Sequence, residues 1–356
     1  MASTHTTRIP DTLEELLTPE WLNAALGRAY PGLQISATVL GRVESRISTN
    51  ACFHMEGEGE LPKGLSADLC AKGYFSDTGT ASHRMAGESE TRFYRDLAAT
   101  SGIRTLPGVF AEWDPAIENG VVITEDITVS GATFLDPRDR FTASHVAASL
   151  EQYAILHSRT WNGHGLVGID WLSSPMARTA GARGIPEIQS QFDGPISAGV
   201  PEEARDAERL VRAFKTLPEI TASASSWCLL HGDAHIGNVF RDQAGLPCLL
   251  DWQLVQRGPW YVDVGYQIAS SLGVADRRAS EQDLLGHYLE RLAAHGVTVP
   301  TWDEVWFGYC CGIVYGLFLW SITQKVKPEI TAVLLERIGT AAADHDAYRV
   351  VLGERP

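Results

Sequence analysis

A short stretch near the middle of the chain has the residue types and spacing needed for phosphoryl transfer. His231, Asp233 and Asn238 form the pattern H-x-D-x-x-x-x-N, and Asp251 begins a D-W-Q string after an intervening predicted strand pair. This is the spacing of a kinase catalytic loop followed by its metal-binding aspartate. In such a loop one carboxylate orients the attacking hydroxyl, while an amide oxygen and a second carboxylate hold magnesium on the triphosphate.

A lysine and a glutamate much earlier in the chain form a candidate ion pair. Lys72 ends an apolar segment, and Glu90 shares a helical period with Phe93, Tyr94 and Leu97 in a helix predicted over 87–99. Glu90 should therefore point inward, where an unpaired charge is costly. Lys72 is its expected partner, and the pair would orient the lysine toward the α- and β-phosphates. Taken singly, Lys72 also fits a solvated strand edge, and Glu90 fits a surface position.

Two segments could contact the rest of a nucleotide. The loop from Gly41 to Asn50 has a single glycine but ends in Ser48-Thr49-Asn50, whose hydroxyls and backbone N–H groups could bind phosphate. An ordinary hairpin turn is the alternative interpretation. The segment from Glu125 through Asp126 to Ile127 follows a predicted strand, in the position of a hinge whose backbone would pair with the adenine edge.

These residues need a mixed framework of strands and helices. Helices are predicted at 12–17 and 19–29, the first from an Asp11-x-x-Glu14 capping box and the second from Thr18-Pro19. Strands are predicted at 34–40, 50–54, 67–72, 109–113 and 120–124, with a hairpin at 239–240 and 247–250. Helices are predicted at 142–160 and 201–217 and through most of the chain after 280. Residues 161–200 show no clear element.

Composition limits the class of protein. A chain of 356 residues with 44% hydrophobic and 21% charged residues is expected to be soluble and globular, with two lobes. A net charge of −15 argues against a nucleic-acid-binding surface. The six cysteines lack metal-ligand spacing, and scattered thiols predict a reducing cytoplasm. The first eleven residues have no apolar run, so no secretory signal is expected.

One apolar segment, residues 305–323, is long enough for a membrane helix. We expect a buried helix of the larger lobe instead, and no association with a membrane. Gly308, Gly312 and Gly316 recur every four residues there, a row that permits close packing of a neighbouring helix. His157, at the end of the predicted helix 142–160, is expected to be a hydrogen-bonded core histidine rather than a site residue.

The string H-G-D-x-H-x-G-N at 231–238, with D-W-Q at 251–253, resembles the aminoglycoside phosphotransferase-like kinases. Within them it is most similar to the ecdysteroid-kinase-like, or choline-kinase-like, branch. The resemblance extends through Lys72, the string Glu90-Thr-Arg-Phe-Tyr94, the segment 122–126 and the string Gly258-Pro-x-x-x-Asp263-Val-Gly-Tyr266. It covers roughly residues 9 to 330.

The resemblance implies an α+β, bilobal protein-kinase-like fold. The N-terminal nucleotide-binding lobe would span 1–126, with an antiparallel sheet, one main helix and a helical extension at 9–30. The larger, mostly helical lobe at 127–356 would carry the catalytic and acceptor-binding residues.

The resemblance also implies residue roles. Asp233 would be the catalytic base, Asn238 and Asp251 would be magnesium ligands, and Lys72, with Glu90 as its partner, would contact phosphate. Further roles fall to Ser48, Thr49 and Asn50 in the nucleotide loop, to Asp263 in tying the chain after the metal site to the larger lobe, and to His231 and His235 in shaping the catalytic loop.

The predicted activity is ATP- and Mg²⁺-dependent phosphorylation of a hydroxyl on a small molecule. D-W-Q lacks the glycine of the protein-kinase motif and no A-P-E follows, so a protein acceptor is disfavoured. Aromatic side chains in the least patterned segments favour an apolar or ring-containing alcohol: Trp161, Trp171, Trp302, Trp306, Tyr309 and Phe318. The alternatives are an amino-sugar or choline-type acceptor and, from another class, a pseudokinase-like module that only binds nucleotide.

Overall fold

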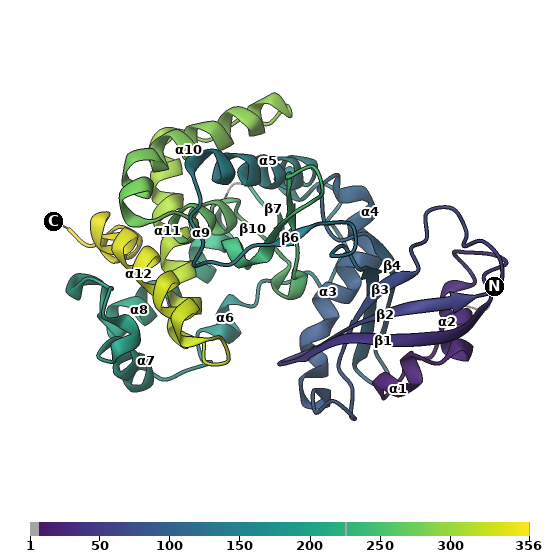
Figure 1. Ribbon diagram of the computed structural model, residues 1–356. Helices are drawn as coiled ribbons and strands as arrows, with labels where there is room; N and C mark the ends of the chain where they lie inside the picture. The colour runs from purple at the N-terminus through teal and green to yellow at the C-terminus, as the bar shows by residue number, and fades with distance from the viewer. Residues whose placement is uncertain (1–6, 225, 356) are drawn as a thin grey trace. The chain divides into compact units, whose positions relative to one another are not determined.

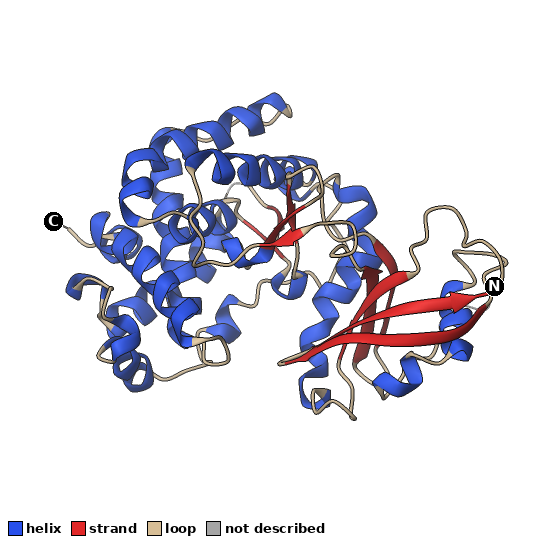
Figure 2. Cartoon of the chain, viewed as in Figure 1, coloured by secondary structure: helices blue, strands red, loops and turns tan. Residues whose placement is uncertain are grey.

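The computed structural model describes residues 7–224 and 226–355, and the side chains of 177 and 178 are not among those described. The chain divides into two compact units. The first extends to Thr133 and includes Asp242–Gly245, and the second contains Phe134–Arg241 and the chain from Leu246. The first unit is built on an antiparallel sheet and the second is mostly helical (Figures 1 and 2). The predicted α+β class is confirmed.

The first unit contains a five-stranded sheet in the order β1-β2-β3-β5-β4. Its strands are β1 (Ile35–Ser45), β2 (Thr49–Gly57), β3 (Asp68–Gly73), β4 (Gly108–Asp114) and β5 (Asn119–Glu125). All neighbouring pairs are antiparallel. Because side chains alternate along a strand, the sheet has two chemically different faces.

One face of this sheet forms the apolar core of the first unit. Alternate residues of β2 and β3, such as Phe53 and Leu69, are buried with Leu16 and Leu22 of the N-terminal helices α1 (Leu13–Leu16) and α2 (Pro19–Leu26). Lys72 has the opposite strand parity from Leu69, so it lies on the other face. The N-terminal helices therefore cover the face that does not carry the lysine.

The predicted boundaries need three corrections in this unit. The first helix is capped by Thr12 rather than Asp11, because the Thr12 hydroxyl accepts the Glu15 N–H at 3.0 Å. Strand β1 continues through residues 41–45, so the predicted loop is only a tight turn closed by Arg46 N–H to Ser48 O, 2.9 Å. The helix predicted over 87–99 is broken into a 3-10 turn Ala81–Gly87, α3 (Glu88–Arg92), a π turn Phe93–Leu97 and α4 (Ala98–Ser101).

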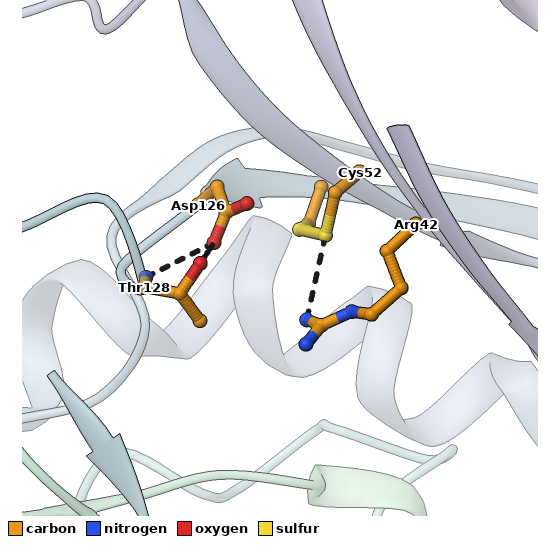
Figure 3. Close-up of a disulfide and its surroundings, with 5 residues drawn as sticks. Arg42, Cys52, Asp126 and Thr128 are labelled. Atoms are coloured by element: carbon orange, nitrogen blue, oxygen red, sulfur yellow. Dashed lines mark hydrogen bonds between the residues drawn. A yellow bond between two sulfur atoms is a disulfide. The ribbon is translucent and has the colours of Figure 1, made fainter. Parts of the chain in front are cut away.

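The six cysteines are not all separate thiols. Cys52 of β2 and Cys70 of β3 are directly paired across the sheet and form a disulfide. Figure 3 shows the Arg42 guanidinium approaching the Cys52 sulfur (3.7 Å), with Asp126 held nearby by Thr128. The other four cysteines are buried and form no disulfide. This pair could not be predicted from cysteine spacing, because only strand register brings residues separated by 18 positions side by side.

The second unit opens with β6 (Thr133–Phe134), at the unit boundary, and α5 (Ala143–Arg159), the helix predicted over 142–160, which Thr142 caps. Residues 161–200 are less irregular than predicted: they contain α6 (Met176–Thr179) and α7 (Ile185–Phe192), with 3-10 turns at Trp161–Gly163 and Pro195–Ser197. The charged helix predicted at 201–217 is shifted, since a 3-10 turn occupies Glu202–Ala204 and α8 spans Ala207–Ser223. Its side-chain cap is Asp206.

Short strands surround the predicted catalytic loop. They are β7 (Cys228–Leu230), which pairs with β10 (Gln256–Gly258), and the hairpin of β8 (Val239–Arg241) with β9 (Pro247–Leu249). The remaining helices are α9 (Tyr261–Ser271), α10 (Val274–Ala294), α11 (Trp302–Ile322), α12 (Pro328–Asp344) and α13 (Ala347–Leu352), and 3-10 turns lie at Ile236–Asn238 and Trp252–Leu254.

Helix α11 is the apolar segment singled out in the sequence. Among the described residues it is the one helix long and apolar enough to cross a membrane, and 78% of its apolar window is buried within the fold. Its glycine row packs against α9, as predicted. A Cβ at Gly312 would lie 2.3 Å from the Tyr261 carbonyl oxygen, and one at Gly316 would lie 2.4 Å from the Tyr266 ring. The glycines thus allow the two helix backbones to approach.

Candidate active site

The catalytic-loop segment begins with a turn that only glycine can make. Gly232 has φ +80°, and a Cβ there would lie 2.0 Å from the Leu254 carbonyl oxygen. An L side chain is therefore excluded by both backbone conformation and space. This turn directs the chain from the end of β7 to Asp233.

Asp263 of α9 hydrogen-bonds to the backbone of this turn. Its carboxylate accepts the backbone N–H groups of His231 (2.7 Å) and Gly232 (2.8 Å), and the side chain is fully buried. His157 completes the set, with Nε2 3.2 Å from Asp263 and Nδ1 2.9 Å from the Tyr288 hydroxyl. His157 is thus a hydrogen-bonded core histidine, as predicted. Asp263 anchors the loop at its start.

The two loop histidines have defined hydrogen-bonding roles. The Asp233 N–H donates to His231 Nδ1 (3.2 Å), so His231 Nε2 carries the proton that is donated to the Leu250 carbonyl (2.9 Å). Similarly, the Gly237 N–H donates to His235 Nδ1 (3.1 Å). Burial lowers the pKa of His235, against the opposing effect of the nearby Asp233 carboxylate. Both imidazoles thus hydrogen-bond to backbone groups, His231 also to Leu250 beyond the loop, and their loop-shaping role stays a prediction.

Asp233 and Asn238 contact each other directly. The Asn238 side-chain amide donates to the Asp233 carbonyl oxygen (2.9 Å) and to Asp233 Oδ2 (3.1 Å). Because both amide hydrogens are used, the side-chain oxygen of Asn238 is the atom suited to a cation. The Asp233 side chain keeps 27% of its surface exposed, so a ligand can reach it.

Asp251 lies next to this pair in an unusual backbone conformation. It follows β9 with φ 66° and ψ 74°, in the left-handed region that a non-glycine residue rarely occupies. The backbone N–H of Leu250 bonds to the Asn238 carbonyl (3.0 Å), and the charges of both Asp233 and Asp251 act on His235. The structure therefore gathers the three predicted polar residues in one place. A carboxylate and an amide oxygen are hard ligands that fit Mg²⁺.

The predicted ion pair is present in the first unit. Lys72 Nζ lies 2.6 Å from Glu90 Oε2, and the side chains keep only 17% and 6% of their surfaces exposed. Glu90 is on α3 and faces inward, as its helical period indicated. A half-buried ammonium held this way is a fixed cation on the non-core face of the sheet.

The predicted nucleotide-loop residues have different environments. Thr49 is fully buried and its hydroxyl contacts those of Thr78 (2.6 Å) and Thr80 (3.2 Å), so its side chain is engaged in the fold. Ser48 is also buried, whereas Asn50 is exposed and pairs across the sheet with Lys72. Of the three, Asn50 is therefore the side chain placed beside the lysine.

The predicted hinge, residues 125–127, continues directly from strand β5. Glu125 ends β5 and pairs with Leu69, and the Asp126 N–H donates to the Asp68 carbonyl (2.9 Å). The Ile127 carbonyl then accepts from Ser130 and Ala132, and the Ile127 side chain is buried.

The aromatic residues predicted for the acceptor pocket do not gather at Asp233. Tyr309 and Phe318 are fully buried, and Trp161 and Trp171 are partly buried. Trp302 and Trp306 line a separate surface cavity of about 350 Å³, with Gln282, Asp303, Phe307 and Val350. That cavity is at the start of α11.

Two other aromatic residues contact the Asp233 carboxylate region. Tyr266 of α9 bonds to Asp233, and Trp320 near the end of α11 bonds to Tyr266. Trp320 is about 27 Å along the helix from Trp302, at 1.5 Å per residue. The helical spacing of Asp263 and Tyr266 was the available signal, because residues at i and i+3 share a face. Here that face contacts the catalytic-loop segment.

One family model matches part of this chain. The sequence model of a family described as APH, phosphotransferase enzyme family, matches residues 175–305. This segment contains Asp233, Asn238 and Asp251. A comparison with curated protein sequences gives no significant match.

Solved structures share the fold at low sequence identity. A spectinomycin phosphotransferase in complex with ADP and spectinomycin has 12% identity and a TM-score of 0.51, with 95% of this chain and 100% of that chain covered. A choline kinase from Streptococcus pneumoniae has 13% identity and a TM-score of 0.51, with 93% and 99% covered. An ethanolamine kinase from Plasmodium vivax has 10% identity and a TM-score of 0.54, with 95% and 91% covered. These likenesses show the fold. The resemblance to the aminoglycoside phosphotransferase-like kinases is supported by the phosphotransferase family model over 175–305, and the finer placement in a branch stays a prediction.

Proposed function

We propose that this protein is an ATP- and Mg²⁺-dependent phosphotransferase that phosphorylates a hydroxyl group of a small molecule. The observation that carries the proposal is the arrangement of Asp233, Asn238 and Asp251, a reachable carboxylate beside two oxygen ligands for a cation. The phosphotransferase match over the same segment supports the reaction class. The ADP bound to the spectinomycin phosphotransferase supports an adenine nucleotide.

Each residue has a distinct role in this proposal. Asn238 and Asp251 would hold Mg²⁺, which neutralises phosphate charge when bound. Lys72, fixed by Glu90, supplies a further cation for the phosphates. Ser48, Thr49 and Asn50 would lie near the phosphates, with Asn50 contributing its side chain, and Glu125 and Ile127 would supply backbone groups for the base. We also propose that the protein is cytoplasmic. This proposal rests on the four cysteines that form no disulfide, whereas the Cys52–Cys70 bond is of a kind that is rare in that compartment.

Asp233 acts on the acceptor. Its carboxylate orients the hydroxyl and accepts its proton as the acceptor oxygen bonds to the γ-phosphorus and the bond to the leaving ADP oxygen breaks. In-line positioning and charge neutralisation account for most of the rate, so Asp233 need not be strongly basic. An acceptor with an apolar or ring-containing portion is the acceptor class we propose, as the aromatic content of the chain predicts. The rings of Tyr266, Trp320 and His235 beside Asp233 pack on one another inside the fold.

A phosphate-acceptor screen tests the proposal. Purified protein with ATP and Mg²⁺ is offered amino sugars, choline analogues, sterols and hydroxy acids, and products are detected by the added mass of a phosphoryl group. We expect one class to be phosphorylated, and Asp233→Asn to lower kcat by about 100-fold or more while leaving ATP affinity nearly unchanged. ATP binding without turnover on any class would favour a nucleotide-binding module, and near-normal activity of the variant would exclude Asp233 as the base.

A further inference from the structure

The Asp233 carboxylate is held from two sides by side-chain donors. Asn238 donates to Oδ2 at 3.1 Å, and the Tyr266 hydroxyl donates to Oδ1 at 3.2 Å. Asn238 belongs to the catalytic-loop pattern, whereas Tyr266 comes from α9 and has no role so far. An ionised carboxylate offers about four lone-pair directions, so two are taken and the others stay available to a substrate.

Trp320 fixes the direction of this hydrogen-bond chain. Its indole nitrogen lies 2.5 Å from the Tyr266 hydroxyl oxygen. An indole N–H can only donate, so the tyrosine oxygen must accept from it. The tyrosine proton is then directed to Asp233 Oδ1. Burial raises the pKa of Tyr266, and the Asp233 charge raises it further, so the hydroxyl remains a donor.

The fold leaves Tyr266 little freedom to move. Its side chain is fully buried, and Trp320 keeps only 5% of its surface exposed. The Tyr266 ring lies in a space that a Cβ at Gly316 would fill, at 2.4 Å. The Trp320 ring also meets the His235 ring edge-on, with centroids 5.2 Å apart. Helix α11 therefore provides both the slot for the ring and the donor for its hydroxyl.

We propose that Tyr266, oriented by Trp320, is a positioning residue that sets the rotamer of Asp233 for the incoming hydroxyl. The inference rests on the proposed function, because it takes Asp233 as the residue that receives the acceptor proton. With Asn238 bonded to Oδ2 and Tyr266 bonded to Oδ1, the carboxylate cannot rotate about its side-chain bonds without losing a hydrogen bond. Its remaining lone pairs therefore keep one direction, and the acceptor hydroxyl is oriented for in-line attack.

The test uses Tyr266→Phe, Trp320→Phe and their combination. Tyr266→Phe removes only the donor, and we expect kcat to fall on the order of 10-fold with the ATP dissociation constant unchanged. Trp320→Phe should lower kcat by a smaller factor, because the hydroxyl remains but loses its orientation. In the double variant kcat should equal that of Tyr266→Phe, since Trp320 acts through Tyr266. Multiplicative losses, or a kcat for Tyr266→Phe within twofold of wild type, would overturn the proposal.

Tyr348→Phe is the matched control. Tyr348 is buried and its hydroxyl also donates a single hydrogen bond, to the Ala204 carbonyl at 2.7 Å, away from the catalytic loop. We expect it to lower thermal stability as Tyr266→Phe does, but to leave kcat unchanged. An equal loss of kcat in both variants would mean that only general stability is involved.

A crystal structure of Tyr266→Phe separates this inference from the proposed function. We expect Asp233 to adopt a second rotamer or two conformers there, against one in the wild-type protein, whether or not an acceptor is known. An unchanged Asp233 would refute the positioning role. A protein that binds ATP but phosphorylates no acceptor would refute the proposed function, while the crystal structure would still decide the role of Tyr266.

Discussion

Lys72 and Glu90 form a 2.6 Å ion pair between β3 and α3 of the first unit, with both side chains largely shielded from solvent. Burying either charge alone would carry a large desolvation cost, so each side chain stabilises the other. The pair also fixes the lysine ammonium in one place. Its removal should therefore affect both nucleotide binding and stability.

Glu90→Gln should weaken binding of Mg²⁺-ATP by roughly 10-fold, because Lys72 loses the carboxylate that orients it. Glu88→Gln, two residues earlier on the same helix, is the control. It changes the net charge equally but breaks only a more exposed pair with Arg92. Calorimetric titration of both variants measures the difference. Equal affinities for the two variants would contradict the role of the pair.

Asp251→Asn should abolish most of the magnesium dependence of nucleotide binding. Asparagine tolerates the left-handed backbone of residue 251, so the change removes charge without adding strain. We expect ATP affinity to fall on the order of 10-fold or more in Mg²⁺ and to stay unchanged in EDTA. Asp242→Asn, in the exposed β8–β9 turn, should bind as wild type. A loss of affinity that is the same with and without Mg²⁺ would contradict the ligand role.

Asp263→Asn should destabilise the protein by about 2–4 kcal/mol. In the wild-type protein the fully buried Asp263 carboxylate accepts the N–H groups of His231 and Gly232. The side-chain NH2 of an asparagine there cannot accept a hydrogen bond, so one of these N–H groups would lose its partner. Asp276→Asn, at a 46% exposed side chain, should change the free energy of unfolding by less than about 0.5 kcal/mol. Urea unfolding of both variants is the measurement. A stable, fully active Asp263→Asn protein would refute the anchoring role.

Reduction of the Cys52–Cys70 disulfide should lower the free energy of unfolding by about 3 kcal/mol, the chain-entropy estimate for a loop of this size. The double variant Cys52→Ser/Cys70→Ser should show the lower stability with or without dithiothreitol. Thiol titration of the unfolded protein counts four thiols if the bond is present. Six free thiols in the protein as isolated would contradict the bond.

Gly312→Ala should destabilise the protein by about 1–3 kcal/mol through overpacking, although alanine favours helix formation. The new Cβ would lie 2.3 Å from the Tyr261 carbonyl oxygen, where backbone must move. Gly286→Ala on α10 meets no atom within 4 Å and should stabilise by about 0.5–1 kcal/mol. Opposite shifts in Tm test the prediction. A Tm for Gly312→Ala equal to or above that of the wild type would show that α9 and α11 are not closely packed.

Much of the fold could be predicted because its signals are local. Strand-forming runs located β2 and β3, the Thr18-Pro19 cap located α2, a helical apolar pattern located α5, and the glycine row predicted the packing face of α11. The predictions failed where local signals were weak or competing. The helix over 87–99 is broken by a π turn, and α7 lies in a segment with no clear helical period.

The candidate site also contains a part that could be predicted from local sequence signals and a part that could not. The types and spacing of His231, Asp233, Asn238 and Asp251 were enough to predict phosphoryl transfer, because that chemistry needs particular groups at particular intervals. The period of Glu90 was enough to predict that it faces inward and pairs with Lys72. These are properties of neighbouring residues, which the order of the chain already contains.

Only the tertiary structure decided which distant side chains complete the site. Tyr266 and Trp320 come from different helices, and their bonds to Asp233 and to each other depend on how α9 and α11 pack. Packing likewise placed Trp302 and Trp306 in a separate cavity, and strand register joined Cys52 to Cys70. The sequence determined the chemistry, since residue types carry it. The structure determined the neighbours, because contacts across the chain depend on packing and register rather than on spacing.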